Sequence, residues 1–144
     1  MDKLDDCISF LSGKAAQTVA RLTRERLTPH GITPVQYAVL QALWEHNELS
    51  AAELCTRLVI DSATITGVVD RLEKLGLVER RSDPTDRRIN RLFLTPEGYG
   101  RRASLEAVMD GVNDEVARAF DTDAPQLWAF LRRLAALGIR SPSA

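Results

Sequence analysis

The sequence predicts a mainly α-helical, α+β protein: a winged helix-turn-helix between long terminal helices. We expect these helices to pair with a second chain, and the alternative is that they pack on the middle of the same chain. Three observations predict this class. Apolar residues recur every three or four positions near both ends of the chain. Two short capped helices follow each other closely in the middle. Two arginine-rich segments with strand character come directly after them. In chain order we expect two helices, a very short strand, two helices, a strand, the wing, a strand and two further helices.

The first two helices are predicted from periodicity and from helix start signals. The first covers about residues 3–28 and ends at the Thr28-Pro29-His30-Gly31 segment. The second covers residues 34–45, and it begins with a capping box formed by Thr33 and Gln36 around a proline at the first helical position. The apolar stripe of the first helix consists of Leu4, Ile8, Leu11, Ala15, Val19 and Leu22.

The helix-turn-helix is predicted in residues 50–76. Ser50 and Glu53 form a capping box for a helix that ends at Leu58. We expect Ser62 to cap the following helix, which reaches Leu75 and is closed by Gly76. Its predicted buried stripe is Ile65, Val68, Val69, Leu72 and Leu75, and its predicted outer face is Ser62, Ala63, Thr64, Thr66, Gly67 and Arg71.

Strand character then replaces helical periodicity. Residues 77–81 and 90–94 are the predicted strands of a hairpin. The segment between the two strands, which we call the wing, begins with the turn-rich residues 82–86. Thr95 and Pro96 begin a fifth helix that runs to about residue 120. Asp123 is the expected cap of a sixth helix, whose apolar positions are Leu127, Phe130, Leu131, Leu134 and Leu137.

The charge is distributed unevenly along the chain. The formal net charge is −1 and the isoelectric point is near 6.1, which by themselves disfavour a nucleic-acid partner. Residues 71–102, however, carry nine basic against five acidic side chains, and the remainder of the chain carries a net charge of −5. The excess of positive charge therefore lies on the end of the helix-turn-helix and on the hairpin.

Two groups of residues are candidates for contact with double-stranded DNA. Small and hydroxylated side chains on the outer face of the second helix of the motif allow close approach to a groove. Arginines at a protruding turn suit a narrow minor groove, and Asp86 can hold Arg88 in a fixed orientation. Taken alone, the hydroxyls can also be simple caps and the arginines a solvated surface. The candidates are Ser62, Thr64, Thr66, Arg71, Asp86, Arg87 and Arg88.

Several other classes of protein are disfavoured. No nucleophile, base and orienting group occur at motif spacing, so we expect no catalytic site. Two cysteines and two histidines without close spacing predict no metal site, and no motif predicts a cofactor. No apolar run approaches membrane-span length, and the acidic first residues are unlike a signal peptide. We therefore expect a cytoplasmic protein without membrane contact.

The order of these segments resembles the MarR (multiple-antibiotic-resistance regulator) family. The resemblance extends over nearly the whole chain, and its most specific part runs from Val69 to Gly98. It implies a homodimeric regulator, usually a repressor, that binds pseudo-palindromic double-stranded DNA. It also implies a DNA-binding domain at residues 31–97, a dimerisation region at residues 1–30 and 98–144, and Arg88 as the minor-groove contact.

The resemblance further implies an effector, a small phenolic or aromatic carboxylate bound between the dimer helices and the winged domain. On this sequence Phe10, Tyr37 and Trp44 are candidate walls, with Lys14, Arg21 or His46 facing the carboxylate. Any of these aromatic residues can instead be ordinary core. Benzoate-, coumarate-, urate- and nicotinate-like acids all remain open.

Two alternatives remain open as well. Some members of the family sense hydroperoxides through a cysteine in the first helix, but Cys7 lies about two residues from that position, which falls nearer Ser9. Only Tyr37 of the required tyrosine pair lies in the second helix. A winged-helix module for protein–protein interaction, in which Arg87 and Arg88 contact an acidic partner, is the second alternative.

Overall fold

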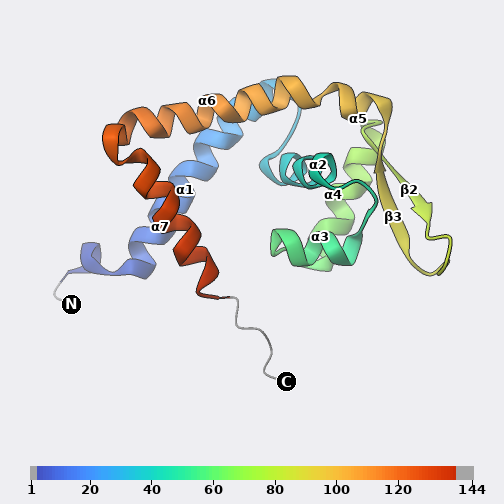
Figure 1. Cartoon of the computed structure of the whole chain (residues 1–144), viewed down its shortest axis with the longest axis horizontal. Helices are drawn as coiled ribbons and strands as arrows, with labels where there is room; N and C mark the ends of the chain where they lie inside the picture. The colour runs from blue at the N-terminus through green and yellow to red at the C-terminus, as the bar shows by residue number, and fades with distance from the viewer. Residues whose placement is uncertain (1–2, 139–144) are drawn as a thin grey trace. The chain divides into compact units, whose positions relative to one another are not determined.

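A computed structural model describes residues 3–138, which fall into two compact units, one within Met1–Val108 and the other within Met109–Ala144 (Figure 1). The first unit holds every strand and most of the helices, and helix α6 crosses from one unit into the other. In chain order the elements are η1 (Leu4–Asp6), α1 (Ile8–Leu27), η2 (Thr28–His30), α2 (Pro34–Glu45), β1 (Leu49–Ser50), α3 (Ala51–Leu58), α4 (Ser62–Lys74), β2 (Val78–Ser82), β3 (Asn90–Leu94), α5 (Pro96–Gly100), α6 (Arg102–Phe120), η3 (Asp121–Asp123) and α7 (Ala124–Ala136), where η denotes a 3-10 helix.

Both capping boxes expected from the sequence are present. At the start of α2, the Thr33 hydroxyl accepts from the Gln36 N–H and the Gln36 side chain accepts from the Thr33 N–H. Ser50 and Glu53 make the same reciprocal pair at the start of α3. The bounds of α2 and α3 agree with the sequence prediction because these helices are fixed by interactions within four residues of their ends.

The prediction for the start and end of α4 was wrong in two details. Asp61, not Ser62, is the cap: its Oδ1 accepts from the Thr64 N–H at 2.7 Å, and Ser62 becomes the first helical residue. A charged carboxylate is the stronger acceptor for an N-terminal N–H group. Leu75 is 47% exposed rather than buried, because it occupies the C-cap just before Gly76 turns the chain with a φ of 71°. Ile65, Val69 and Leu72 are buried as expected.

The first and fifth predicted helices are each interrupted. Cys7 is extended and separates the short η1 from α1, and the far end of α1 continues into η2. The predicted fifth helix is divided into α5 and α6 at Arg101, whose N–H donates to the Glu97 carbonyl as a cap. Two glycines within α5 lower its helix propensity and favour this division.

The expected cap of the last helix is absent. Asp123 precedes α7, but its side chain makes no capping hydrogen bond. The three residues before α7 form η3, which places Asp123 in a helical rather than an extended conformation. A capping side chain needs the extended backbone that this position lacks.

The sheet is antiparallel with the strand order β1-β3-β2. Strand β3 is central, and the register pairs Arg91 with Ser50 on one side and with Arg81 on the other. Apolar side chains from α2, α3, α4 and β3 form the core of this unit, together with the first turns of α6. Its fully buried members include Leu40, Leu43, Leu54, Ile65, Leu72, Leu92 and Leu105.

Gly98 lies where the chain that leaves β3 passes close to the chain that leaves α4. Thr95 caps α5 and donates from its hydroxyl to the Gly76 carbonyl at 2.5 Å, which joins the end of α4 to the start of α5. The buried Trp44 Nε1 donates to the Gly98 carbonyl at 3.1 Å. A Cβ at Gly98 would lie 2.1 Å from the Leu77 carbonyl oxygen, so only glycine allows the two backbones to meet here.

Helices α1 and α7 each leave an apolar face uncovered. In α1 only Thr23 and Leu27 are buried, and every residue from 11 to 21 is exposed. In α7 only Ala124 is buried. Large apolar side chains that remain at least 40% exposed on these helices are Ile8, Leu11, Val19, Phe130, Leu131, Leu134 and Leu137.

Candidate nucleic-acid interface

Helix α4 presents the outer face that the sequence predicts. Ser62, Thr64, Thr66 and Arg71 are all exposed, and a methyl group added at Gly67 between them would meet no atom within 4 Å. The Thr66 hydroxyl donates to the Ser62 carbonyl at 2.9 Å, so its lone pairs remain available while its proton is engaged. Arg71 forms no ion pair within residues 3–138. The outer face of α4 is therefore polar, and its one cation, Arg71, lies toward the C-terminal end of the helix.

The Asp61 carboxylate occupies the N-terminus of α4. Asp61 already accepts from the Thr64 backbone, and this hydrogen bond holds the pKa of the Asp61 carboxyl below its usual value. A negative charge therefore occupies the helix end at which an anion would otherwise bind.

Asp83 organises the turn of the hairpin. It is 5% exposed, and its Oδ1 accepts from the Thr85 N–H at 2.8 Å, the Thr85 hydroxyl at 2.6 Å and the Asp86 N–H at 3.2 Å. The hydrogen bond from the Thr85 hydroxyl and, after it, the one that the Arg91 guanidinium donates to Oδ2 hold the pKa of the Asp83 carboxyl far below its usual value. Two backbone bonds, from the Asp83 N–H to Ile89 and from the Ile89 N–H to Asp86, close the turn.

The tip of the wing carries a braced arginine. Arg88 Nε and Nη2 donate to the two oxygens of Asp86, each at 3.1 Å, and the Arg88 N–H donates to the same carboxylate. This is the bidentate brace expected from the sequence. The pair raises the pKa of Arg88 and lowers that of Asp86, yet the Arg88 side chain remains 90% exposed. Arg87 beside it is exposed and has no ion-pair partner in the described part of the chain.

The other arginines of the hairpin are paired within the protein. Arg80 binds Asp70 at 2.7 Å and also Glu73, both on α4. Arg81 pairs with Glu79 and stacks on Phe93, with 4.3 Å from its guanidinium carbon to the ring centroid. Of the basic residues on the hairpin, Arg87 and Arg88 at the tip are the most outward-facing cations.

The sequence did not reveal the partners of Arg91. Its Nε binds Asp83 Oδ2 at 2.5 Å, and its Nη1 donates to the Glu48 carbonyl at 2.8 Å and lies 3.5 Å from Glu53 Oε2. These partners lie between 8 and 43 residues away along the chain. The only sequence signal for this cluster is the pattern of opposite charges at 83 and 91.

The four predicted effector-pocket residues form two separate pairs. Lys14 Nζ lies 5.7 Å from the Phe10 ring centroid on α1. On α2, Tyr37 and Trp44 are 6.0 Å apart and edge to face. Phe10 is 17 residues before the buried Leu27, about 25 Å along the helix. Trp44 is buried in the core of its unit.

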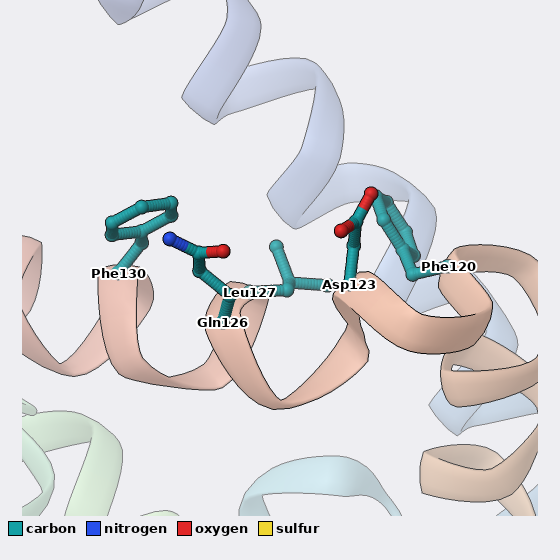
Figure 2. Close-up of a pocket in the computed structure, with 5 residues that line it drawn as sticks. All are labelled: Phe120, Asp123, Gln126, Leu127 and Phe130. Carbon is teal, nitrogen blue, oxygen red and sulfur yellow. The ribbon is translucent and has the colours of Figure 1, made fainter.

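A hollow that the sequence did not predict lies at the corner where α6 gives way to α7. It has a volume of about 340 Å³, and Figure 2 shows its lining side chains along one side of the corner, with Phe120 and Phe130 at the two ends and Leu127 between them. Asp123 and Gln126 supply its polar atoms. Both phenylalanines are about half exposed, so the hollow continues the uncovered apolar face of α7.

The thiols and the remaining polar groups suggest no separate reactive centre. Cys7 and Cys55 are both free and half-buried. Within residues 3–138, no three histidine, cysteine or acidic side chains come together as metal ligands would. None of the helices in that range combines the length and the apolar character needed to cross a membrane.

Comparison with known proteins decides the family. A sequence model of the MarR family matches residues 32–89. The HTH-type transcriptional regulator YsmB of Bacillus subtilis (strain 168), which is itself uncharacterised, is 32% identical over 126 residues, covering 82% of this chain and 86% of that protein. The chain belongs to the MarR family. In the HTH-type transcriptional regulator TtmR of Methylorubrum extorquens (strain PA1), 36% identity extends over 118 residues, 82% of this chain but only 60% of that longer protein.

One solved structure shares the fold over the whole chain. CouR of Rhodococcus jostii RHA1, bound to p-coumaroyl-CoA, superimposes with a TM-score of 0.85 at 27% identity, covering all of both chains. The MarR family match covers α2 to the wing, which is the part that carries the helix-turn-helix and the braced arginine. The protein is therefore a MarR-type winged-helix transcriptional regulator, and the relatives compared are regulators rather than enzymes.

Proposed function

We propose that this chain is a homodimeric repressor that binds pseudo-palindromic double-stranded DNA and is released by a small aromatic or phenolic carboxylate. Residues 31–97 are the DNA-binding domain, and residues 1–30 and 98–144 form the dimerisation region. The observation that carries the proposal is the exposed outer face of α4 beside a wing in which the 90% exposed Arg88 is fixed by Asp86. A fixed and exposed guanidinium suits the negative potential of a narrow minor groove.

The residues of the interface take different roles. Ser62, Thr64 and Thr66 contact base edges or phosphates from α4, and Arg71 binds the DNA backbone. Arg88 enters the minor groove, Arg87 contacts a phosphate, and Asp86 orients Arg88. The role of Asp61 follows from its charge: it disfavours a phosphate at the backbone N–H groups of the α4 N-terminus, so that contacts from this turn are made by the side-chain hydroxyls.

The uncovered faces of α1 and α7 support a dimer. Isolated apolar residues are common on protein surfaces, but here they continue along one face of each helix. A second copy of the chain would cover these faces, and two-fold symmetry would place two α4 helices about 34 Å apart, one turn of duplex. The hollow bounded by Phe120 and Phe130 belongs to the same face.

The DNA-binding proposal is tested with duplexes selected by the wild-type protein from a random pool. Arg88→Ala should weaken binding about tenfold and lower the slope of log affinity against log salt by about one for each wing. Arg118→Ala, which removes an exposed arginine of α6, is the matched control and should change neither quantity. Equal affinities and slopes for wild type and Arg88→Ala would refute the role of the wing.

The dimer is tested by sedimentation. Leu134 on α7 and Leu75 at the end of α4 have similar exposure, 43% and 47%. Leu134→Glu should shift the protein toward monomer because it places a charge on the uncovered face, whereas Leu75→Glu should leave the mass unchanged. A dimer of unchanged stability with Leu134→Glu would exclude this face of α7 as the interface.

The effector is tested by melting the protein with benzoate, p-coumarate, 6-hydroxynicotinate and p-coumaroyl-CoA. CouR, the similar protein from Rhodococcus jostii, is bound to the last of these. A ligand at a hundredfold excess over its dissociation constant should stabilise the folded state by about 2.7 kcal/mol and release bound DNA. Unchanged melting curves with the whole panel would count against an aromatic effector.

A further inference from the structure

Arg91 joins three separate parts of the DNA-binding unit. It lies on the central strand β3, and the hairpin that it supports projects away from the helices in Figure 1. Its guanidinium contacts Asp83 in the wing turn, the Glu48 carbonyl before β1 and Glu53 in the first turn of α3. The Arg91 side chain is about one-third exposed, and Asp83 is almost fully buried beneath it.

Asp83 connects Arg91 to the tip of the wing. One of its oxygens shapes the turn by accepting from Thr85 and Asp86, while the other holds Arg91. Asp86 in turn braces Arg88. An ion pair between Glu53 and Arg91 and hydrogen bonds through Asp83 and Asp86 therefore connect the start of α3 to the exposed Arg88.

The backbone alone joins the hairpin to the helix-turn-helix weakly. Strand β1 has only two residues, and just two pairs, Leu49 with Leu92 and Ser50 with Arg91, connect it to β3. The turn residues 83–89 lie beyond the last pair of the β2–β3 ladder. The side chain of Arg91 adds contacts at the place where the two-residue strand β1 joins β3.

We propose that Arg91 is a positioning residue: it fixes the wing relative to α3 and α4, so that Arg87 and Arg88 reach DNA together with the recognition helix without Arg91 touching DNA. The inference rests on the proposed DNA-binding function. Only arginine fits this role, because its planar fork donates in several directions at once, whereas lysine offers the same charge from one point. Removal of the fork should therefore loosen the wing while the net charge is unchanged.

Arg81 provides a matched control. It is the cross-strand neighbour of Arg91 and is likewise partnered, but only by Glu79 on its own strand and by the Phe93 ring. If Arg91 served only as a positive charge or as a stabiliser of the strand pair, the substitutions Arg81→Lys and Arg91→Lys would have similar effects. The positioning role predicts that they differ.

The first measurement needs no DNA. In the free protein, the N–H groups of Asp83 and Ile89 are hydrogen-bonded within the wing turn. Arg91→Lys should accelerate amide exchange at both sites about tenfold, while Arg81→Lys leaves them unchanged. Amides of α2 report whether the whole domain is still folded. If they also accelerate, Glu53→Gln replaces Arg91→Lys, because glutamine keeps the capping box and the Asp83–Arg91 pair but loses the charge that faces Arg91.

The second measurement is a double-mutant cycle on a duplex selected by the wild-type protein. Arg88→Ala should weaken binding about tenfold in wild type and in Arg81→Lys, but less than about twofold in Arg91→Lys, because a loosened wing no longer places Arg88 in the groove. Equal losses in all three backgrounds, together with unchanged exchange, would overturn the positioning role. If Arg88→Ala has no effect even in wild type, the proposed wing contact fails, and the exchange data alone then decide whether Arg91 fixes the wing.

Discussion

Replacement of Gly98 by alanine tests how closely the start of α5 packs on the end of α4. An added Cβ would lie 2.1 Å from the Leu77 carbonyl oxygen and 3.1 Å from Leu94 Cδ2. The first contact is with backbone, which cannot move aside as a flexible side chain can. The Leu77 carbonyl also accepts from the Thr95 N–H, so a shift at this point disturbs the connection between β3 and α5.

Two opposed effects determine how much Gly98→Ala changes the free energy of unfolding. Helix propensity alone favours alanine over glycine by about 0.5–1 kcal/mol. Overpacking against backbone costs about 1–3 kcal/mol, and loss of the bond from Trp44 Nε1 to the Gly98 carbonyl costs about 1 kcal/mol more. We therefore expect Gly98→Ala to lower the free energy of unfolding by about 2 kcal/mol.

Gly100 is the control, since it lies in the same helix and a Cβ there would meet no atom within 4 Å. Gly100→Ala should be neutral or stabilising by about 0.5 kcal/mol. Urea unfolding followed by circular dichroism, with all variants at one protein concentration, measures both values. If Gly98→Ala proves as stable as Gly100→Ala, the close approach of the two backbones is not present in solution.

Three further predictions concern the helix-turn-helix and the wing. Val59 has a φ of 54° and is 91% exposed, so Val59→Asn should raise the free energy of unfolding by about 1 kcal/mol; a loss of stability in urea would contradict the left-handed turn. Gly67→Ala should stabilise α4 by about 1 kcal/mol yet weaken DNA binding, because its methyl group would occupy the outer face; tighter binding would show that this face is not in the groove. Because the pKa of Asp83 is lowered in the folded state, its carboxylate stabilises the protein above the ordinary aspartate pKa near 3.9, and this contribution is lost as the pH falls further. The stability difference between wild type and Asp83→Asn should thus be constant from pH 5 to 7 and shrink in acid, and a difference independent of pH would refute it.

The sequence was sufficient to predict an element wherever the interaction that fixes that element joins residues close together in the chain. The capping boxes at Thr33 and Ser50 join residues three apart, and the bidentate pair of Asp86 and Arg88 joins residues two apart. Such contacts depend on backbone conformations that the sequence itself favours. They predict the bounds of α2 and α3 and the brace at the tip of the wing.

Local signals were insufficient where two neighbouring residues compete or where a helix can break. Asp61 and Ser62 are both good caps, and besides the stronger acceptor of Asp61 the choice depends on the path of the chain out of α3, where Val59 turns it sharply. At Arg101 the glycines of α5 favour a division, and the close approach of Gly98 to Leu77 fixes the path of the chain just before it. Local preference and packing against other elements therefore act together at these boundaries.

The sequence shows the opposed charges along the chain, but it does not show which basic side chains face outward. The sequence by itself determined that the basic side chains gather on the end of the helix-turn-helix and on the hairpin, and that the order of helices and strands resembles that of the MarR family. Only the tertiary structure decided that Arg80 and Arg91 bind carboxylates of α4, α3 and the wing turn, whereas Arg87 and Arg88 face solvent. The physical reason is that an ion pair requires two groups within a few ångströms of each other, and residues as far apart as 53 and 91 meet only when the sheet has folded.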